Sequence, residues 1–336
     1  MQTQLRFPIT EASQIAEARR VMSEMARRLN FNATEIGKVA LVVTEAATNL
    51  LKHATQGQLV IRALEQTGSV GLELLALDRG PGIANINEAL RDGYSTAGSA
   101  GTGLGAIMRL ATEFDLYSKV GAGTAILARF WLRPRPAAER TPTVQLGVIS
   151  LAQAGEQVCG DGWAIQPEAD SCMVVVADGL GHGPDAAKAA QAIIQPLDAH
   201  PTLPPTEYLA LAHAAARGTR GAAVAVAELD WSAKIVRFAG VGNISAQVND
   251  GPNRRHLVSH NGIVGHEMRK VQEFTTPWSA NALLILHSDG LTTHWDLANY
   301  PGLTAHDPSL VAGVLYRDFT RERDDVTVLV IKQNEP

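Results

Sequence analysis

The chain has 336 residues, of which 46% are hydrophobic and 19% are charged, and its formal net charge is −5. This composition is normal for globular domains with sizeable cores and argues against a disordered chain. The length suffices for two domains of ordinary size. The negative charge disfavours binding to nucleic acid through a basic face, so we expect no nucleic-acid partner.

The first residues of the chain and its two cysteines indicate the cellular compartment. The first ten residues, MQTQLRFPIT, lack an apolar core followed by a small-residue cleavage site, so no secretory signal is visible. No apolar run approaches the roughly 18–20 residues that span a bilayer. The two cysteines, Cys159 and Cys172, lack CxxC spacing, which favours reduced thiols. We therefore expect a cytoplasmic protein without a membrane partner.

The first 132 residues alternate between helical and strand patterns. Apolar residues recur at three- and four-residue steps from Ile15 to Leu29, which is the stripe of an amphipathic helix. Asn32 can cap a second helix, with Glu35 three residues on, that runs to about Ala54. We predict strands at 59–64 and 71–77, a helix near 104–111, and a hairpin of 114–120 and 124–132. Helices on one face of a mainly antiparallel sheet make an α+β layer.

Three polar residues share one face of the predicted second helix. Glu45, Asn49 and His53 are four residues apart, and a step of four residues turns a helix by about 400°, so their side chains project in nearly one direction. Taken alone, the three residues are better interpreted as a polar stripe on the outer face of the helix.

Two glycine-rich segments follow this helix. Asp78-Arg-Gly-Pro-Gly82 comes directly after an apolar strand, which puts a carboxylate at the strand end and glycines where the backbone turns tightly. Gly101-Thr-Gly-Leu-Gly105 opens a helix, where backbone N–H groups and the positive helix end can meet phosphate. A glycine cluster alone could be only a loop, but the three elements in this order form a specific pattern.

With these motifs, most of residues 5–132 resembles the GHKL ATPase superfamily, whose Bergerat fold lays helices on an antiparallel sheet. The resemblance implies that Asn49 holds Mg²⁺ on the ATP phosphates, that Asp78 accepts from the adenine amino group and that Glu45 is the general base. Mg²⁺ suits a site in which the phosphates supply most of the oxygen ligands and the protein supplies only a few. A carboxylate such as that of Glu45 can accept a proton from a hydroxyl group. The ATP-binding residues would be Asn49, Asp78, Gly80, Gly82, Gly101, Thr102, Gly103, Leu104 and Gly105.

Within the superfamily, the compact domain looks like the anti-sigma-factor serine kinases, and especially the switch kinase of the bacterial stressosome (RsbT-like). No phosphoacceptor-histidine helix pair precedes Glu45, and no large transducer domain follows the glycine segments. The resemblance implies phosphorylation of serine or threonine on STAS-domain proteins. Catalysis would rest on positioning and charge neutralisation at the transferred phosphoryl group.

A proline-rich segment divides the chain. Residues 133–143, RPRPAAERTPT, hold three prolines and no apolar periodicity, which predicts an exposed, fairly stiff linker. We therefore expect one domain at 1–132 and another at 144–336. In the second, strands are predicted at 145–152, 172–177, 222–229, 235–239, 282–287 and 326–331, and helices near 184–199, 206–217 and 308–320. Strands apolar almost throughout indicate a sheet sandwich covered by helices.

Four acidic positions recur at predicted strand ends or glycine turns of the second half. They are Asp161, Asp178, Asp289 and the pair Asp324-Asp325. A single Asp-Gly pair is most often only a turn. Four acidic positions beside apolar strands, with no His or Cys residues next to them, form a more specific pattern. Oxygen-only sites favour hard ions such as Mg²⁺ or Mn²⁺ over Zn²⁺, so the pattern predicts a metal site.

The order and the residues of these motifs resemble those of the type 2C metal-dependent protein phosphatases, in their SpoIIE/RsbX-like branch, over about 144–332. The family's fold is an α-β-β-α sandwich. The resemblance implies two Mn²⁺ or Mg²⁺ ions bound by Asp161, Asp178, the carbonyl of Gly179, Asp289 and Asp324. Asp324 is preferred over Asp325 because the family's ligand is the first residue of that pair. The ions would activate water and clamp the phosphate for in-line displacement.

His182 stands beside this motif and leaves two alternatives open. It is a candidate to protonate the leaving serine oxygen, or it merely caps the following helix or faces solvent. We do not count it among the catalytic residues. The segment Val241-Gly-Asn-Ile-Ser245 is interpreted as a structural turn at a strand edge.

Together the two resemblances imply a bifunctional switch that phosphorylates and dephosphorylates STAS-domain regulators, namely anti-sigma antagonists or stressosome proteins. One alternative is a phosphatase regulated by a non-catalytic, ATP- or partner-binding first domain. Another is an anti-sigma-type binding module that contacts a sigma-factor regulator or a downstream phosphatase. The kinase relatives also suggest a homodimer through the N-terminal domain.

Overall fold

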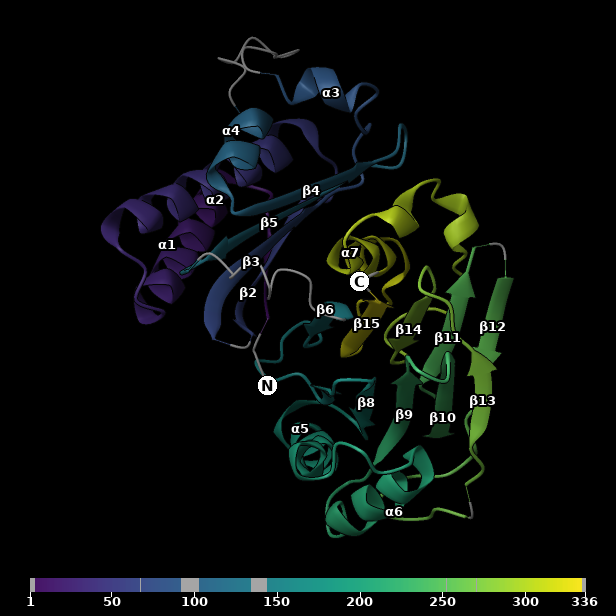
Figure 1. Cartoon of the computed structure of the whole chain (residues 1–336). Helices are drawn as coiled ribbons and strands as arrows, with labels where there is room; N and C mark the ends of the chain where they lie inside the picture. Colours follow the sequence, from purple (N-terminus) through teal and green to yellow (C-terminus); the bar gives the residue numbers. More distant parts are fainter. Residues whose placement is uncertain are drawn as a thin grey trace. The chain divides into compact units, whose positions relative to one another are not determined.

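The computed structural model describes residues 4–66, 68–91, 103–133, 144–251, 253–269 and 271–333. These residues form two compact units (Figure 1). The first unit combines residues 4–133 with Asn299–Arg317, and the second combines residues 144–298 with residues 318–333. Of the predicted linker 133–143, all but its first residue lies outside the described residues.

The first unit is built on one antiparallel sheet of order β1-β2-β3-β5-β4. Its strands are β1 (Leu5–Pro8), β2 (Gln58–Gln66), β3 (Ser69–Leu77), β4 (Glu113–Ser118) and β5 (Thr124–Trp131). The predicted strands and hairpin are present, and the sheet gains the short edge strand β1. That strand was not predicted, because four residues that include a proline carry little alternation.

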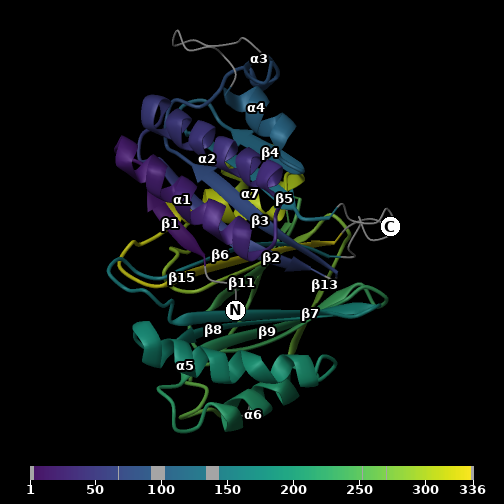
Figure 2. The same ribbon diagram turned by 90° about the vertical axis from the view of Figure 1, so that its left-hand side faces the viewer.

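Two long helices cover one face of this sheet (Figure 2). They are α1 (Ala12–Arg28) and α2 (Ala33–His53). The predicted cap forms, because Asn32 Oδ1 accepts from the Glu35 amide and Glu35 Oε2 accepts from the Asn32 amide, each at 2.9 Å. Such a reciprocal pair satisfies two N–H groups that a helix start leaves open. The short helices α3 (Ile86–Ala89) and α4 (Gly103–Leu110) complete this side.

The other face of the sheet is covered by α7 (Pro308–Phe319), whose residues up to Arg317 belong to the first unit. Strand β3 shows how the two faces are shared. Leu72 and Leu74 join the core under α1 and α2, whereas Glu73, Leu75 and Leu77 face α7. Ser309 Oγ donates to Glu73 Oε2 at 2.9 Å, and Gly313 packs against Leu77 and Leu75. A helix layer on this second face was not predicted.

The second unit consists of two antiparallel sheets, of order β13-β10-β9-β8-β7 and β12-β11-β14-β15-β6. The first sheet contains β7 (Asp161–Pro167), β8 (Ser171–Gly179), β9 (Ala222–Asp230), β10 (Ile235–Val241) and β13 (Phe274–Pro277). The second contains β6 (Val144–Leu151), β11 (Ser245–Asp250), β12 (Asn253–Leu257), β14 (Leu283–His287) and β15 (Val326–Gln333).

Helices α5 (Gly183–Ile194) and α6 (Pro205–Ala215) pack on the sheet that contains β8 and β9 (Figure 2). Their core residues include Ile193, Tyr208 and Val175, all buried. A separate core lies between the two sheets and includes Val174, Phe238 and Leu329. The predicted sandwich is therefore confirmed. Strands β7, β11, β12 and β13 were not predicted; the Gly160-Asp161-Gly162 segment that opens β7 was assigned to a strand end or glycine turn, with no strand after it.

The lengths of the helices and the state of the two cysteines were also predicted from the sequence. None of the helices described here is long and apolar enough to cross a membrane. Cys159 and Cys172 are both free thiols, and Cys172 is buried among apolar residues.

Candidate active sites

The predicted nucleotide residues of α2 meet the start of α4. Glu45 and Asn49 are half-buried, whereas His53 is exposed. A Cβ atom added to Gly103 would lie 3.2 Å from Asn49 Nδ2 and 3.4 Å from Glu45 Oε2. A side chain there would crowd both polar groups, so the glycine lets the α4 backbone approach them closely. The sheet and its helices thus bring together two of the three predicted motifs.

Asp78, the residue predicted to read adenine, is the first residue after β3 and is only 9% exposed. Its Oδ1 accepts from the Gly80 amide at 2.7 Å, and Gly80 lies close to the last turn of α2, because an added Cβ would be 3.0 Å from the His53 carbonyl oxygen. Burial raises the pKa of the Asp78 carboxyl, and the Gly80 amide opposes that rise. The first glycine segment therefore packs on the helix that carries Glu45 and Asn49.

The remaining glycines of the two segments are only partly described. Gly82 has φ +73°, and an added Cβ would lie 2.3 Å from the Lys119 carbonyl oxygen, so this turn requires glycine. Gly103, Leu104 and Gly105 form the first turn of α4. Gly101 and Thr102 lie outside the described residues.

One contact at this site was not predicted. Arg317 is 3% exposed, and its guanidinium donates to the backbone carbonyl of Asp78 at 2.9 Å and to that of Thr124 at 3.4 Å. Arg317 is 239 positions away from Asp78 in the sequence. No local pattern could have revealed the contact, because it depends on which face of the sheet α7 covers.

The predicted metal residues begin with a cross-strand pair. Asp161, the first residue of β7, lies directly opposite Asp178 near the end of β8. Residues opposite each other in an antiparallel pair point to the same face, and two like charges there destabilise the sheet. Asp161 is 1% exposed, and its Oδ2 accepts from Ser288 Oγ at 2.7 Å.

The other predicted ligands are electrostatic neighbours of this pair. Burial, then repulsion from Asp161, Asp289 and Asp324, raises the pKa of Asp178 to about 9. Burial likewise raises the pKa of Asp161 and, with repulsion from Asp289, that of Asp324. None of these four carboxylates forms an ion pair with a lysine or arginine in the described part of the chain.

Asp325 differs from Asp324 in what its carboxylate contacts. Asp325 is 3% exposed, and its two oxygens accept from the amides of Gln153 and Gly160, each at 2.9 Å. Both oxygens are therefore used, one to hold the loop after β6 at Gln153 and the other to hold Gly160, just before β7. Asp324 Oδ1 accepts from the following amide at 3.0 Å, and its carboxyl also interacts with that of Asp289, another predicted ligand. This arrangement favours Asp324 as the ligand.

Two polar residues at the acidic cluster were not predicted to take part. Asn243, assigned above to a structural turn, donates from Nδ2 to Asp289 Oδ2 at 2.8 Å. Ser288 donates to Asp161 and in turn accepts from the Thr327 amide at 2.9 Å. The sequence did offer a signal for Ser288, because Ser288 and Thr327 lie inside the motifs that contain Asp289 and Asp324.

The donor set suits a hard divalent ion, although the side chains are not arranged around one point. Within the described ranges, no three His, Cys, Asp or Glu side chains are grouped closely enough to hold a metal ion as they stand. The neighbouring groups are carboxylates without a cationic partner, and the oxygen-only set matches Mg²⁺ or Mn²⁺. Gly179, whose carbonyl was predicted as a ligand, packs against Ala186 of α5 so closely that an added Cβ would clash.

His182 precedes α5 but makes no side-chain cap to that helix. Its Nδ1 lies 2.7 Å from Glu156 Oε1, and its side chain is 55% exposed. The capping alternative is therefore wrong, and His182 takes part in a solvent-facing pair with Glu156.

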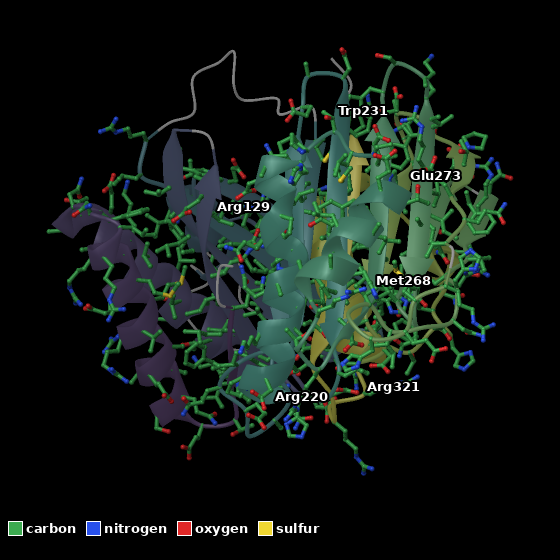
Figure 3. The ribbon with its side chains drawn as sticks, turned by 90° about the horizontal axis from the view of Figure 1, so that it is seen from below. Arg129, Arg220, Trp231, Met268, Glu273 and Arg321 are labelled. Carbon is green, nitrogen blue, oxygen red and sulfur yellow. The ribbon has the colours of Figure 1, made fainter. Side chains whose placement is uncertain are left out.

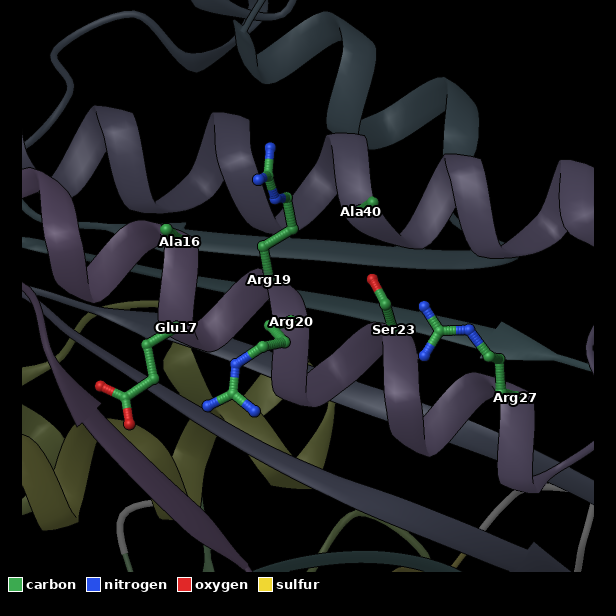
Figure 4. A pocket seen from close by; sticks show the side chains of 7 residues that line it. All are labelled: Ala16, Glu17, Arg19, Arg20, Ser23, Arg27 and Ala40. Carbon is green, nitrogen blue, oxygen red and sulfur yellow. The ribbon is translucent and has the colours of Figure 1, made fainter.

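A pocket of about 710 Å³ lies apart from both sites (Figure 4). It is lined by Ala16, Glu17, Arg19, Arg20, Ser23 and Arg27 of α1 and by Ala40 of α2. None of the predicted nucleotide or metal residues that the structure describes lines it, so we assign it no part in the chemistry.

Comparison with known proteins bears on both units. A family model described as a histidine kinase-like ATPase domain matches residues 7–130, and one described as stage II sporulation protein E (SpoIIE) matches residues 168–334. The serine/threonine-protein kinase RsbT of Bacillus subtilis (strain 168) is 38% identical over 119 residues, which are 35% of this chain and 90% of RsbT.

The second half has relatives of its own. The phosphoserine phosphatase RsbX of Bacillus subtilis (strain 168) is 21% identical over 198 residues, which are 57% of this chain and 96% of RsbX. A solved structure from work on the bacterial stressosome as a modular system that controls secondary messenger signalling has a TM-score of 0.53 and 26% identity. It covers 57% of this chain and 100% of its own. These matches confirm both predicted resemblances and the α+β fold class. The chain therefore belongs to the histidine kinase-like ATPase family, with RsbT as a relative, and joins that domain to one that matches the SpoIIE family model and has the type 2C phosphatase fold.

Proposed function

We propose that the chain is a bifunctional enzyme of a partner-switching pathway, in which one domain phosphorylates a regulator and the other dephosphorylates it. The observation that carries the phosphatase half is the pairing of Asp161 opposite Asp178 on neighbouring strands. Two carboxylates facing each other, one of them almost fully buried, are costly unless a positive charge lies between them. Divalent cations supply that charge.

In the phosphatase half, Asp161, Asp178, Asp289, Asp324 and the carbonyl of Gly179 would hold two Mn²⁺ or Mg²⁺ ions. When bound, such ions lower the pKa of water and neutralise phosphate charge. The protein's own contribution is to fix the carboxylates. Ser288 orients Asp161 through a 2.7 Å hydrogen bond, and Asn243 orients Asp289 through one of 2.8 Å. Water attacks the phosphorus, the bond to the serine oxygen breaks, and that oxygen takes up a proton.

In the kinase-like half, we propose that ATP binds with its adenine at Asp78 and its phosphates at Asn49 and the start of α4. The positive end of α4 and its backbone N–H groups suit the phosphates, and Asn49 would hold the accompanying Mg²⁺. Glu45 accepts the proton of the serine or threonine hydroxyl while that oxygen attacks the γ-phosphorus and ADP leaves. The closeness of Gly103 to both Glu45 and Asn49 supports this assignment.

The proposed substrate is a STAS-domain phosphoprotein, an anti-sigma antagonist or a stressosome regulator. The relatives support this, because they include a serine/threonine-protein kinase and a phosphoserine phosphatase, and because one similar structure comes from work on the bacterial stressosome. A sigma-factor regulator or a downstream phosphatase is a further proposed partner. If the first domain forms homodimers, it must use a surface other than the sheet face that α7 covers.

The contact between Arg317 and Asp78 favours a second candidate, in which the first domain binds ATP only to regulate the phosphatase. Incubation of the full chain with labelled ATP, Mg²⁺ and purified STAS proteins separates the two. The bifunctional account predicts transfer to serine or threonine that a Glu45→Gln variant loses while still binding nucleotide. Nucleotide binding without transfer to any STAS protein would leave only the regulatory candidate.

A further inference from the structure

Helix α7 is part of the phosphatase half by sequence, yet its residues through Arg317 pack with the kinase-like unit. Every residue from Pro308 to Arg317 is buried. A helix packed on a sheet in this way cannot shift without disturbing its contacts. The two ends of α7 are fastened to the sheet in different ways.

The first turn of α7 is held by a row of alternating charges across the sheet. Arg62, Glu73, Arg129 and Glu113 are successive cross-strand partners on β2, β3, β5 and β4. The Arg129 guanidinium (labelled in Figure 3) donates two hydrogen bonds of 2.8 Å to the Asp307 carboxylate, just before the helix. Bidentate pairs of this kind fix geometry as well as adding energy.

The last turn of α7 is held at the nucleotide segment. Arg317 donates to the Asp78 and Thr124 carbonyls, and the Arg79 guanidinium donates to the Arg317 carbonyl. Asp78 and Arg79 open the glycine segment of the proposed adenine site. The backbone of that segment and the end of α7 are therefore bonded in both directions.

Beyond Arg317 the chain enters the second unit and runs directly to the acidic cluster. The Thr292 amide donates to the Phe319 carbonyl at 3.0 Å, and the Arg321 amide donates to the Gly290 carbonyl at 2.9 Å. Gly290 follows Asp289, and Asp324 lies three residues after Arg321. The residues that leave α7 therefore hold the turn of one proposed metal ligand and precede another.

We propose that α7 couples nucleotide binding in the first domain to the geometry of the acidic cluster in the second, with Arg317 as the positioning residue at the nucleotide end. The inference rests on the proposed ATP and metal sites. A bound nucleotide that shifts the Asp78–Gly82 backbone displaces the end of α7 through Arg317, and with it the Asp289 turn. Helix shifts of 1–2 Å are a common form of such switching.

Thermodynamic linkage makes this coupling reciprocal. If nucleotide changes the affinity of the acidic cluster for its cation, the cation changes nucleotide affinity by the same factor. Coupling requires one structural element with two arrangements, and each ligand must bind more tightly to the protein in one arrangement than in the other. The candidate element here is α7, because it is bonded at one end to the nucleotide segment and continues at the other into the acidic motifs.

The test uses the full chain and three variants of the end of α7. Arg317→Met removes the donors to Asp78 and Thr124 while keeping the apolar stem, and Arg317→Lys returns one charged donor. Tyr316→Phe is the matched control, because it removes a hydroxyl at the same helix end whose hydrogen bonds to Gln58 and Arg6 lead to β2 and β1. Thermal unfolding and binding of a fluorescent ATP analogue establish that each variant is folded and occupied.

Two readouts follow addition of a non-hydrolysable ATP analogue as its Mg²⁺ complex. One is hydrogen exchange of the amides of residues 286–293 and 317–327. The other is hydrolysis of p-nitrophenyl phosphate at buffered free Mn²⁺. We expect both to change in the wild type and in Tyr316→Phe, the rate by about fivefold or more. In Arg317→Met the rate should change by less than about twofold, and Arg317→Lys should be intermediate.

Three results would count against the coupling and differ in meaning. If nucleotide binds but changes neither readout in the wild type, the inference fails and the proposed function stands. If Arg317→Met responds as fully as Tyr316→Phe, α7 does not transmit the effect through Arg317. If no nucleotide binds to the wild type, the ATP site itself is wrong and the coupling is wrong with it.

Discussion

Asp161 and Asp178 are direct register partners on neighbouring antiparallel strands, so two carboxylates face each other at one end of a sheet whose core is apolar. Ordinary packing does not favour this arrangement, because each carboxylate raises the cost of ionising the other. Repulsive groups retained at a strand end are typical of a functional site, which sacrifices stability for chemistry.

Replacement of Asp178 by asparagine should separate stability from activity. We expect Asp178→Asn to leave the metal-free protein as stable as the wild type or more stable, because it replaces a carboxyl whose ionisation burial and Asp161 oppose with a neutral amide of the same shape. Phosphatase activity and stabilisation by Mn²⁺ should both be lost. Urea unfolding in the presence of EDTA, followed by titration with Mn²⁺, measures these effects. A clear loss of metal-free stability would mean that Asp178 is a structural residue.

Asn243 should act through Asp289. Its amide donates to one Asp289 oxygen, which leaves the other oxygen for a metal. Loss of such a supporting contact typically costs about 10–100-fold in metal affinity. We therefore expect Asn243→Ala to raise the Mn²⁺ concentration needed for half-maximal activity by that factor, with a smaller change in rate at saturating Mn²⁺. Asn243→Gln, which keeps the donor, should recover part of the affinity. An unchanged Mn²⁺ requirement would make Asn243 a turn residue only.

The contact of Arg129 with α7 should be a major source of stability for the first unit. The Arg129 side chain is 12% exposed and pairs with Glu73, Glu113 and Asp307. Breaking a buried pair leaves charges uncompensated, so Arg129→Met should cost about 3–5 kcal/mol in the free energy of unfolding.

Arg237 offers a control for this prediction. It also sits on a strand and pairs with two acids, Glu228 and Asp230, but its side chain is 31% exposed. Arg237→Met should therefore cost less than about 1 kcal/mol. Denaturant unfolding of both variants provides the measurement, and equal costs would show that the bonds of Arg129 to α7 contribute little.

Glu73 should make the first unit sensitive to acid. Burial raises the pKa of its carboxyl, but Arg62 and Arg129 lower it more strongly, to about 2. Because an unfolded glutamate titrates near pH 4.3, the folded state holds fewer protons in this range. The stability that Glu73 contributes is therefore present above about pH 4.3 and is lost as the pH falls toward 2. Glu73→Gln should show a shallower fall in melting temperature between pH 5 and pH 3, whereas parallel curves for the two proteins would contradict this role.

The sequence predicted both motif sets because their residues lie close together along the chain. The cap at Asn32, the face shared by Glu45 and Asn49, and the acids at strand ends all follow from local periodicity and turn chemistry. The preference for Asp324 over Asp325 came from family resemblance, and the two amides on Asp325 now give a physical reason for it.

What could not be predicted depends on contacts between distant segments. Strand β3, with the sequence Gly-Leu-Glu-Leu-Leu-Ala-Leu, is buried along both faces, and strands of that kind need a covering layer on each side. The pattern therefore carries a signal for a second layer, although no such layer was predicted. It did not indicate that the layer is α7, more than 230 residues later, because pairing over such a distance leaves no periodic signal.

The central claim is that the acidic cluster binds paired divalent cations, and calorimetric titration of the nucleotide-free full chain with Mn²⁺ tests it most directly. Without nucleotide phosphates, the site at Asn49 offers too few ligands to contribute. We predict two Mn²⁺ ions per chain in the wild type and loss of that binding in Asp178→Asn. Absence of Mn²⁺ binding, or the same binding in both proteins, would contradict the claim.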